Sequence, residues 1–136
     1  MKALTICQPY AWLITLPVSD PRHKRCENRR WPTSYRGPLL IHAGKSRDWL
    51  DTWDDISWEE SAAMVYGAIV GKTELVDCVT LNEVRNRLFD DRMKPTQHAE
   101  GPWCWILGEV VPIPPIYCPG KLGLWDYHGQ VSGGWK

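Results

Sequence analysis

The chain has 136 residues, and its 16 lysines and arginines are balanced by 16 aspartates and glutamates. Hydrophobic residues make up 43% and charged residues 24%, a composition that excludes a disordered chain. No apolar run reaches the roughly 18–20 residues of a membrane span, so we expect a cytoplasmic protein without membrane contacts. The length fits one domain over residues 1–136, since single domains usually hold about 100–200 residues.

The cysteines do not follow the spacing of a metal site or a disulfide framework. There are five, an odd number, and none belongs to a C-x-x-C pair. Such a pattern favours reduced thiols in a cytosolic protein. We therefore expect no metal and no cofactor.

Three strands and a short helix are predicted in the first third of the chain. Residues 2–7 and 37–43 are rich in apolar and β-branched residues, and residues 25–31 form a candidate strand between them. A short helix follows residues 2–7, with Pro9 at its first position, where the missing N–H is not needed.

The next segment, residues 46–66, has the pattern of an amphipathic helix. Its apolar stripe consists of Trp49, Trp53, Ile56 and Met64. Ser57 is a candidate cap for a second helical segment inside it.

The rest of the chain predicts further strands separated by short connections. Residues 68–79 form the longest candidate strand, and Thr80 with Glu83 is a capping box for a helix through Leu88. Residues 90–102 are expected to be a loop and residues 103–111 a strand, followed by a proline-rich stretch. Strands interrupted by short helices indicate a mostly β (α+β) fold, a small β-barrel decorated with short α-helices.

Nine tryptophans accompany a single phenylalanine. Those in apolar surroundings, which we expect in the core, are Trp12, Trp49, Trp105 and Trp125. Those beside proline, glycine or basic residues, which suit a partly exposed stacking surface, are Trp31, Trp103 and Trp135.

The stretch from Lys24 to Trp31 is the most informative for function. In an extended chain, side chains alternate, so Arg25, Glu27 and Arg29 share one face and Lys24 enters from the preceding turn. A carboxylate between cations stays ionised and can orient them. Guanidinium groups beside an aromatic ring suit a flat, partly anionic ligand, although a surface strand with ion pairs has the same pattern.

Other candidate residues flank this stretch. Gln8 could read the edge of a base, because its amide both donates and accepts hydrogen bonds. The basic run continues through Arg36 and Lys45, before six acidic residues between positions 48 and 60. His42, within residues 37–43, is either a ligand group or a hydrogen-bonded core residue, and we favour the core.

Several segments together resemble the ASCH domain family of the PUA-like superfamily. They are I-C-Q-P-Y-A-W-L-I, K-R-C-E-N-R-R-W-P-T-S-Y-R-G-P-L-L-I-H-A-G-K, A-I-V-G-K-T-E-L-V-D-C-V and G-P-W-C-W-I-L. The family signature G-x-K-x-x-E-x-R is present as Lys24-x-x-Glu27-x-Arg29, with Arg22 in place of the glycine. The resemblance runs from about residue 4 to residue 125.

This resemblance implies a β-barrel with a cleft that binds RNA, another single-stranded nucleic acid or a modified nucleobase. Lys24 and Arg29 would face phosphate or base, Glu27 would order them, and Gln8 with Tyr10 would form the opposite wall. The full set of binding candidates is Gln8, Tyr10, Lys24, Glu27, Arg29, Trp31, Arg36 and Lys45.

Two other function classes stay open. Some ASCH members hydrolyse acetylated cytidine with a lysine, a threonine and a glutamate; Lys24 matches the lysine, Glu27 occupies the threonine position, and Glu74 or Glu83 is a candidate for the third residue. A ribonuclease would use Lys24 and Glu27 as its acid–base pair. A protein-interaction module would use exposed tryptophans and prolines near the C-terminus.

Overall fold

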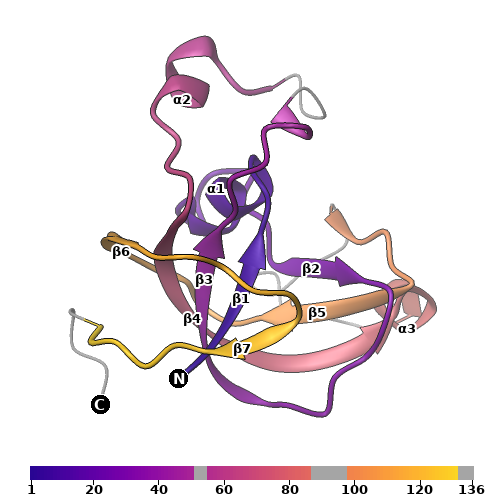
Figure 1. The fold of residues 1–136 in the computed structure, drawn as a ribbon. Coiled ribbons are helices and arrows are strands. Elements are labelled where there is room, and N and C mark those ends of the chain that lie inside the picture. The colour runs from indigo at the N-terminus through magenta and orange to yellow at the C-terminus, as the bar shows by residue number, and fades with distance from the viewer. Residues whose placement is uncertain (51–54, 87–97, 132–136) are drawn as a thin grey trace.

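The computed structural model describes residues 1–50, 55–86 and 98–131. Within these ranges the fold is mostly β, a single sheet accompanied by short helices (Figure 1). The expectations for Trp53, Leu88, residues 90–97 and Trp135 lie outside the described residues. None of the described helices is long and apolar enough to cross a membrane.

The elements in chain order are β1 (Lys2–Ile6), α1 (Tyr10–Thr15), β2 (Cys26–Arg29), β3 (Gly37–Ala43), α2 (Trp58–Ala62), β4 (Ala68–Thr80), α3 (Leu81–Asn86), β5 (Trp103–Leu107), β6 (Val111–Tyr117) and β7 (Leu124–Asp126). The strand order is β2-β5-β4-β3-β1-β7, and β6 pairs with β4 beside β5. Strands β1 and β3 are parallel, whereas all other pairs in the described sheet are antiparallel.

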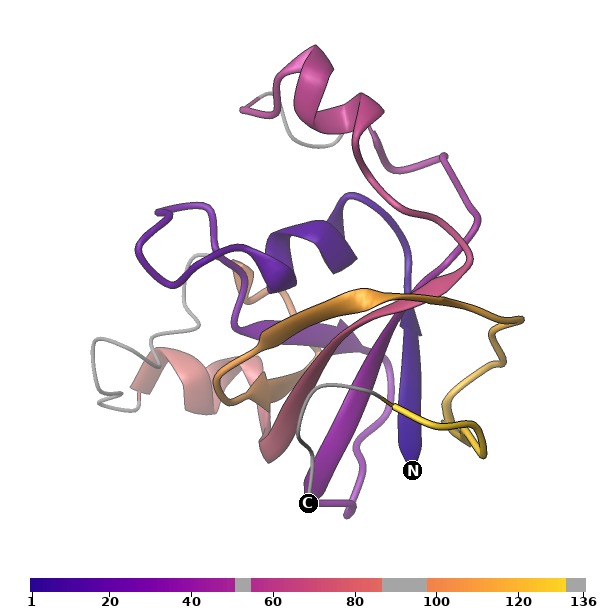
Figure 2. The same ribbon diagram turned by 90° about the vertical axis from the view of Figure 1, so that its left-hand side faces the viewer.

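The predicted barrel is only partly right, because the sheet is not closed. In the described part of the chain, β2 and β7 end the strand order and do not pair with each other. The long strand β4 shifts register against β3, β5 and β6, and the sheet curves around it without closing (Figures 1 and 2).

The alternation of side chains along β3 explains why residues 37–43 are almost continuously apolar. Leu39 and Ile41 pack in one fully buried cluster with Ile14 of α1, whereas Leu40 packs in a second cluster with Trp125 of β7. Both faces of the central strands are therefore covered. This packing fixes α1 and the loop after it against the end of β1.

Residues 46–66 do not form one long helix, so that prediction is wrong. Among the described residues of this range only α2 is an α-helix, and Ser57 caps it in a reciprocal capping box with Glu60, as the sequence indicated for Ser57. None of the residues of α2 is buried, and Trp58 is 80% exposed. Without a surface to pack against, an amphipathic pattern does not sustain a helix. We name residues 44–50 and 55–67 the arm (Figure 1).

Several local predictions are corrected or confirmed by the strands and caps. The strand expected over residues 103–111 ends at Leu107, and the proline-rich segment after it forms β6, paired along one edge of β4, where prolines are tolerated. Pro9 is the N-cap of α1 rather than its first residue. The capping box of Thr80 and Glu83 is confirmed.

Candidate functional site

A cavity of about 300 Å³ lies between α1, β2, the arm and the loop before β5. Its lining residues are Cys7, Tyr10, Lys24, Glu27, Asn28, Trp49, His98 and Glu100. We call it the first cavity. Three of the binding candidates from the sequence meet here: Tyr10, Lys24 and Glu27.

Lys24 and Glu27 form the charged floor of the first cavity. The Lys24 side chain is 3% exposed; its Nζ donates to the Cys26 carbonyl at 2.6 Å and to Oε1 of Glu27 at 2.8 Å. Oε2 of Glu27 lies 3.0 Å from a guanidinium nitrogen of Arg29. Glu27 thus stands between two cations, the arrangement expected from the sequence. The Lys24 ammonium also lies over the ring of Tyr10, 5.4 Å from its centroid, so Lys24 contacts two oxygen acceptors and one aromatic face.

Arg29 and Gln8 do not line the first cavity; they hold residues and segments around it in place. The Nη2 group of Arg29 donates to the Thr5 carbonyl at 2.8 Å while it pairs with Glu27. Gln8 is 2% exposed; its amide donates to the Val65 carbonyl and accepts from the Trp12 backbone N–H, both at 2.8 Å. Gln8 therefore ties the arm to α1 instead of pointing at a ligand.

The structure does not bring Trp31, Arg36 or Lys45 to the first cavity. Trp31 is 53% exposed, and its carbonyl accepts a hydrogen bond from the Trp105 indole. Arg36 is exposed and reaches Asp77 at 3.4 Å. Lys45 lines a second cavity, described below.

Five lining residues were not foreseen as site residues: Cys7, Asn28, Trp49, His98 and Glu100. Trp49, expected in the core, is 51% exposed and lines the first cavity, because the arm leaves the body of the fold. Asn28 donates to the His98 carbonyl at 2.8 Å and accepts from the backbone N–H groups of Glu100 and Gly101. The one available signal was an asparagine inside a predicted strand, where asparagine is depleted. Nothing in the sequence linked His98 to this place.

The carboxylates proposed as a third hydrolytic residue lie elsewhere. Glu74 is exposed on β4, and Glu83 caps α3 through Thr80. Neither lines the first cavity, whereas Glu100 does. Among the described residues, Glu100 is the further carboxylate that lines this cavity beside Lys24 and Glu27.

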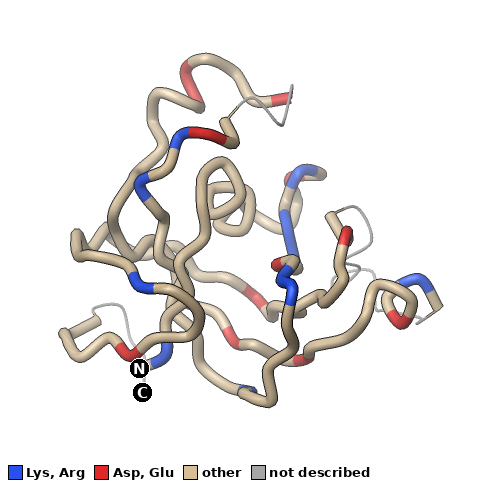
Figure 3. The backbone as a smooth tube through the Cα atoms, turned by 45° about the vertical axis from the view of Figure 1, so that its right-hand side comes forward, with Lys and Arg blue, Asp and Glu red and all other residues tan. Residues whose placement is uncertain are grey.

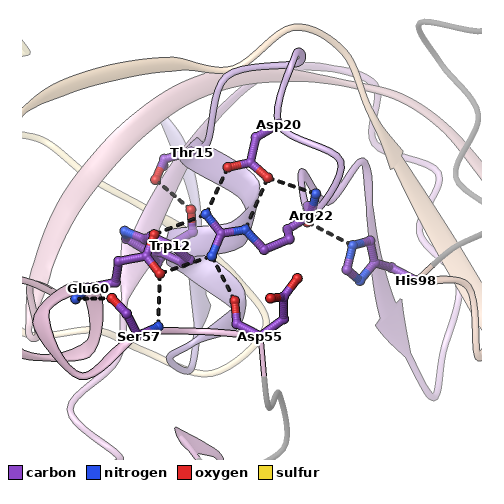
Figure 4. A network of polar contacts seen from close by, with 8 residues as sticks. All are labelled: Trp12, Thr15, Asp20, Arg22, Asp55, Ser57, Glu60 and His98. Atoms are coloured by element: carbon purple, nitrogen blue, oxygen red, sulfur yellow. Dashed lines mark hydrogen bonds and ion pairs between the residues drawn. The ribbon is translucent and has the colours of Figure 1, made fainter.

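Arg22, which replaces the glycine of the signature, is the centre of a polar network (Figure 4). Its guanidinium pairs with Asp20 at 2.9 Å and with Glu60 of the arm at 3.0 Å, and lies over the ring of Trp12. Hydrogen bonds from Arg22 hold the pKa values of Asp20 and Glu60 at about 2. The Arg22 carbonyl accepts a hydrogen bond from Nε2 of His98 at 3.0 Å. One residue thereby connects the arm, the loop before Lys24 and the opposite wall.

Two titratable groups of the first cavity are uncharged at neutral pH. Burial lowers the pKa of His98 to about 4. Burial, with a contribution from the nearby Glu27 carboxylate, raises the pKa of the Cys7 thiol, so this thiol is not poised as a nucleophile. Among the described residues, no group of His, Cys, Asp and Glu side chains is placed to hold a metal ion.

Several cations of the basic run seen in the sequence are paired with acidic residues in space. Figure 3 shows the lysines and arginines of residues 22–30 close to acidic residues. Arg22 pairs with Asp20 and Glu60, while Lys24 and Arg29 share Glu27. The site is therefore a compact polar cavity with aromatic walls, and these residues do not form a continuous basic track.

The comparisons with known proteins point to one family. The model of the ASCH domain matches residues 4–112. A search of curated proteins returned no match to this chain. Among solved structures, a variant of ZmASCH from Zymomonas mobilis is similar at 19% identity with a TM-score of 0.46, over 85% of this chain and 74% of that one. Because the family model covers most of its length, the chain belongs to the ASCH domain family.

Proposed function

We propose that the first cavity binds a single nucleobase, either of a free nucleoside or of single-stranded RNA. The observation that carries this proposal is a base-sized cavity with aromatic side chains on its walls and the buried Lys24–Glu27 pair on its floor. The ASCH family is PUA-like, and membership is consistent with RNA binding in general.

The volume supports one base as the ligand. Sites for small molecules usually enclose about 300–1,000 Å³, so a cavity of about 300 Å³ is at the lower end of that range. A planar base with part of its ribose fits such a volume, whereas several nucleotides do not.

The lining supports a flat, polar ligand. Trp49 is half-exposed and can offer a face of its ring to a base, and stacking on an aromatic ring contributes about 1–3 kcal/mol. The half-buried Tyr10 adds a second aromatic wall, with the Lys24 ammonium 5.4 Å from its ring centroid. The Lys24 ammonium can donate to a carbonyl oxygen of the base, and Glu27 or Glu100 can accept from a ring or exocyclic N–H. Recognition of a base edge requires hydrogen-bond donors and acceptors held in fixed positions on one side of the cavity.

Titration of the protein with the four common ribonucleosides and with single-stranded RNA, followed by tryptophan fluorescence, tests the proposal. Trp49→Ala should weaken binding, and Trp58→Ala is the matched control because Trp58 lies on the exposed α2. Absence of binding to every nucleoside and RNA at low salt would refute the proposal.

A hydrolase is the second candidate, and one observation favours it. Lys24 and Glu27 form an ion pair at 2.8 Å on the floor of the same cavity, the residue types of a general acid and base, and the Glu100 carboxylate also lines it. Glu27 stands where an acetylated-cytidine hydrolase of this family carries a threonine, so the hydroxyl nucleophile is absent at that position. Turnover of acetylated cytidine or of labelled RNA that disappears in Lys24→Ala, with the fold intact, would establish this activity.

A further inference from the structure

A second cavity, of about 410 Å³, lies at the C-terminal ends of the parallel strands β1 and β3. Its lining residues are Thr5, His42, Gly44, Lys45, Pro119, Gly120, Lys121 and Leu122. Two are lysines and none is acidic, although acidic and basic residues are equal in number in the chain. This cavity therefore favours an anion, in contrast to the first cavity with its two glutamates.

Close backbone packing places the two lysines at this cavity. Lys45 is the second residue of the arm, and its side-chain stem lies against Gly67, where an added Cβ would be 3.0 Å from the Lys45 Cε. Lys121 follows Gly120, whose backbone lies so close to the floor that a Cβ there would be 2.6 Å from Oγ1 of Thr5. Both lysines are exposed at the rim, so their charged ends are accessible to solvent and to a ligand.

The floor of the second cavity is a network of hydrogen bonds around the buried His42. His42 is 1% exposed, and Nε2 donates to the Cys118 carbonyl at 2.8 Å, since a carbonyl can only accept. Nδ1 of His42 accepts from the Thr5 hydroxyl at 3.2 Å, and that oxygen accepts from the Trp125 indole. The expectation that His42 is a core residue is confirmed. Lys45 and Lys121 supply the charge of this cavity.

Two lining residues, one from each cavity, lie two positions apart at the end of β1. Thr5 lines the second and Cys7 the first, about 7 Å apart along an extended chain, a separation that one nucleotide spans. Arg29 lies between them, bound to the Thr5 carbonyl and to Glu27. Its Nε is buried without an acceptor among the described residues, so this junction holds a donor that the protein does not satisfy.

We propose that the second cavity binds a backbone phosphate of a single-stranded nucleic acid whose base occupies the first cavity, with Lys45 and Lys121 as the cationic contacts. The inference rests on the proposed function and narrows its ligand to a strand instead of a free nucleoside. Trp49 and Lys45 lie four residues apart on the arm, so one segment contacts both the base and the phosphate.

Binding of a nucleoside compared with binding of its dinucleoside monophosphate tests the inference. The wild-type protein should bind the dinucleotide at least tenfold more tightly. The double variant Lys45→Ala/Lys121→Ala should lose this advantage and keep its nucleoside affinity. The slope of log affinity against log salt for the dinucleotide should fall by about 0.7, the contribution of one single-strand phosphate contact.

Arg85→Ala is the control, because Arg85 is an exposed cation on α3 and lines neither cavity. This variant should still bind the dinucleotide at least tenfold more tightly than the nucleoside. A mononucleotide with a terminal phosphate is the third ligand. If it binds as tightly as the dinucleotide, the result supports a phosphate site in the second cavity but contradicts a nucleic-acid strand as the required ligand.

The outcomes separate this inference from the proposed function. Equal affinity of the wild type for nucleoside and dinucleotide, or an unchanged advantage in the double variant, overturns the phosphate site while nucleoside binding still stands. Absence of any nucleoside or dinucleotide binding refutes the proposal that the first cavity binds a base. Thermal denaturation of the double variant should match the wild type, since both substitutions remove exposed side chains.

Discussion

Substitution of Glu27 by glutamine isolates the buried charge cluster. The carboxylate is the counter-charge of both Lys24 and Arg29, with contacts of 2.8 and 3.0 Å. The exposed fractions of the three side chains are 3%, 12% and 20% for Lys24, Glu27 and Arg29. Glutamine keeps the shape and one acceptor but leaves two adjacent cations without a counter-charge.

The expected loss of stability follows from this burial. Removal of one partner from a buried ion pair costs about 3–5 kcal/mol, against about 0–1 kcal/mol for an exposed pair. Because the glutamine oxygen still accepts one hydrogen bond, we expect a value near the lower limit, about 3 kcal/mol. For a domain of this size that corresponds to a melting temperature lower by roughly 10 °C.

Lys24→Met is the matched comparison, because it removes a buried charge and leaves Glu27 paired with Arg29. It should cost less than Glu27→Gln, and the double variant should be no less stable than Glu27→Gln alone, since the two residues are coupled. Urea denaturation at pH 7 measures all three free energies of unfolding. A loss below about 1 kcal/mol for Glu27→Gln would show that solvent already screens the cluster.

Three further changes address other parts of the site. Trp49→Ala should weaken nucleoside affinity by about 1–3 kcal/mol in fluorescence titrations, whereas Trp58→Ala should not change it. Arg22→Gly, which restores the residue of the family signature, should lower the melting temperature and weaken nucleoside binding, because it disconnects the arm from the loop before Lys24; equal values for variant and wild type would contradict this role. The unfolded chain binds more protons than the folded one between about pH 6.5 and 4, because burial lowers the pKa of His98 to about 4. The unfolding free energy should therefore fall by up to about 3 kcal/mol as the pH decreases through that window, and His98→Gln should reduce this loss in urea titrations.

Much of the central sheet could be predicted from the sequence, because its signals are local. Strands β1, β3 and β4 follow from runs of apolar and β-branched residues, and the caps of α2 and α3 follow from residues three positions apart. The contact of Lys24 with Glu27 also spans only three positions. Patterns at this range are visible without knowledge of the fold.

The wall of the first cavity that Asn28, Trp49, His98 and Glu100 form depends on contacts between segments that are distant in the sequence. Asn28 bonds to residues about 70 positions later, and Trp49 reaches the cavity from an arm that the sequence predicted to be an amphipathic helix with Trp49 in the core. Gln8 was expected to face a ligand, but a polar residue before a helix can equally turn inward and bond to backbone groups, as it does here. Periodicity does not distinguish these cases, because tertiary packing decides them.

The pairing of charges also changes what electrostatics can contribute to binding. A run of cations predicts strong attraction of a phosphate backbone, yet Arg22, Lys24 and Arg29 are each held by acidic partners. Of the described residues that line either cavity, Lys45 and Lys121 are the cations that form no ion pair with a described acidic residue, so at most about two phosphate contacts are available. At about 0.7 per contact on a single strand, the slope of log affinity against log salt should not exceed about 1.4. A much steeper slope in RNA titrations would require cations beyond these two cavities, and the base-binding floor of Lys24 and Glu27 would then be secondary to a surface track.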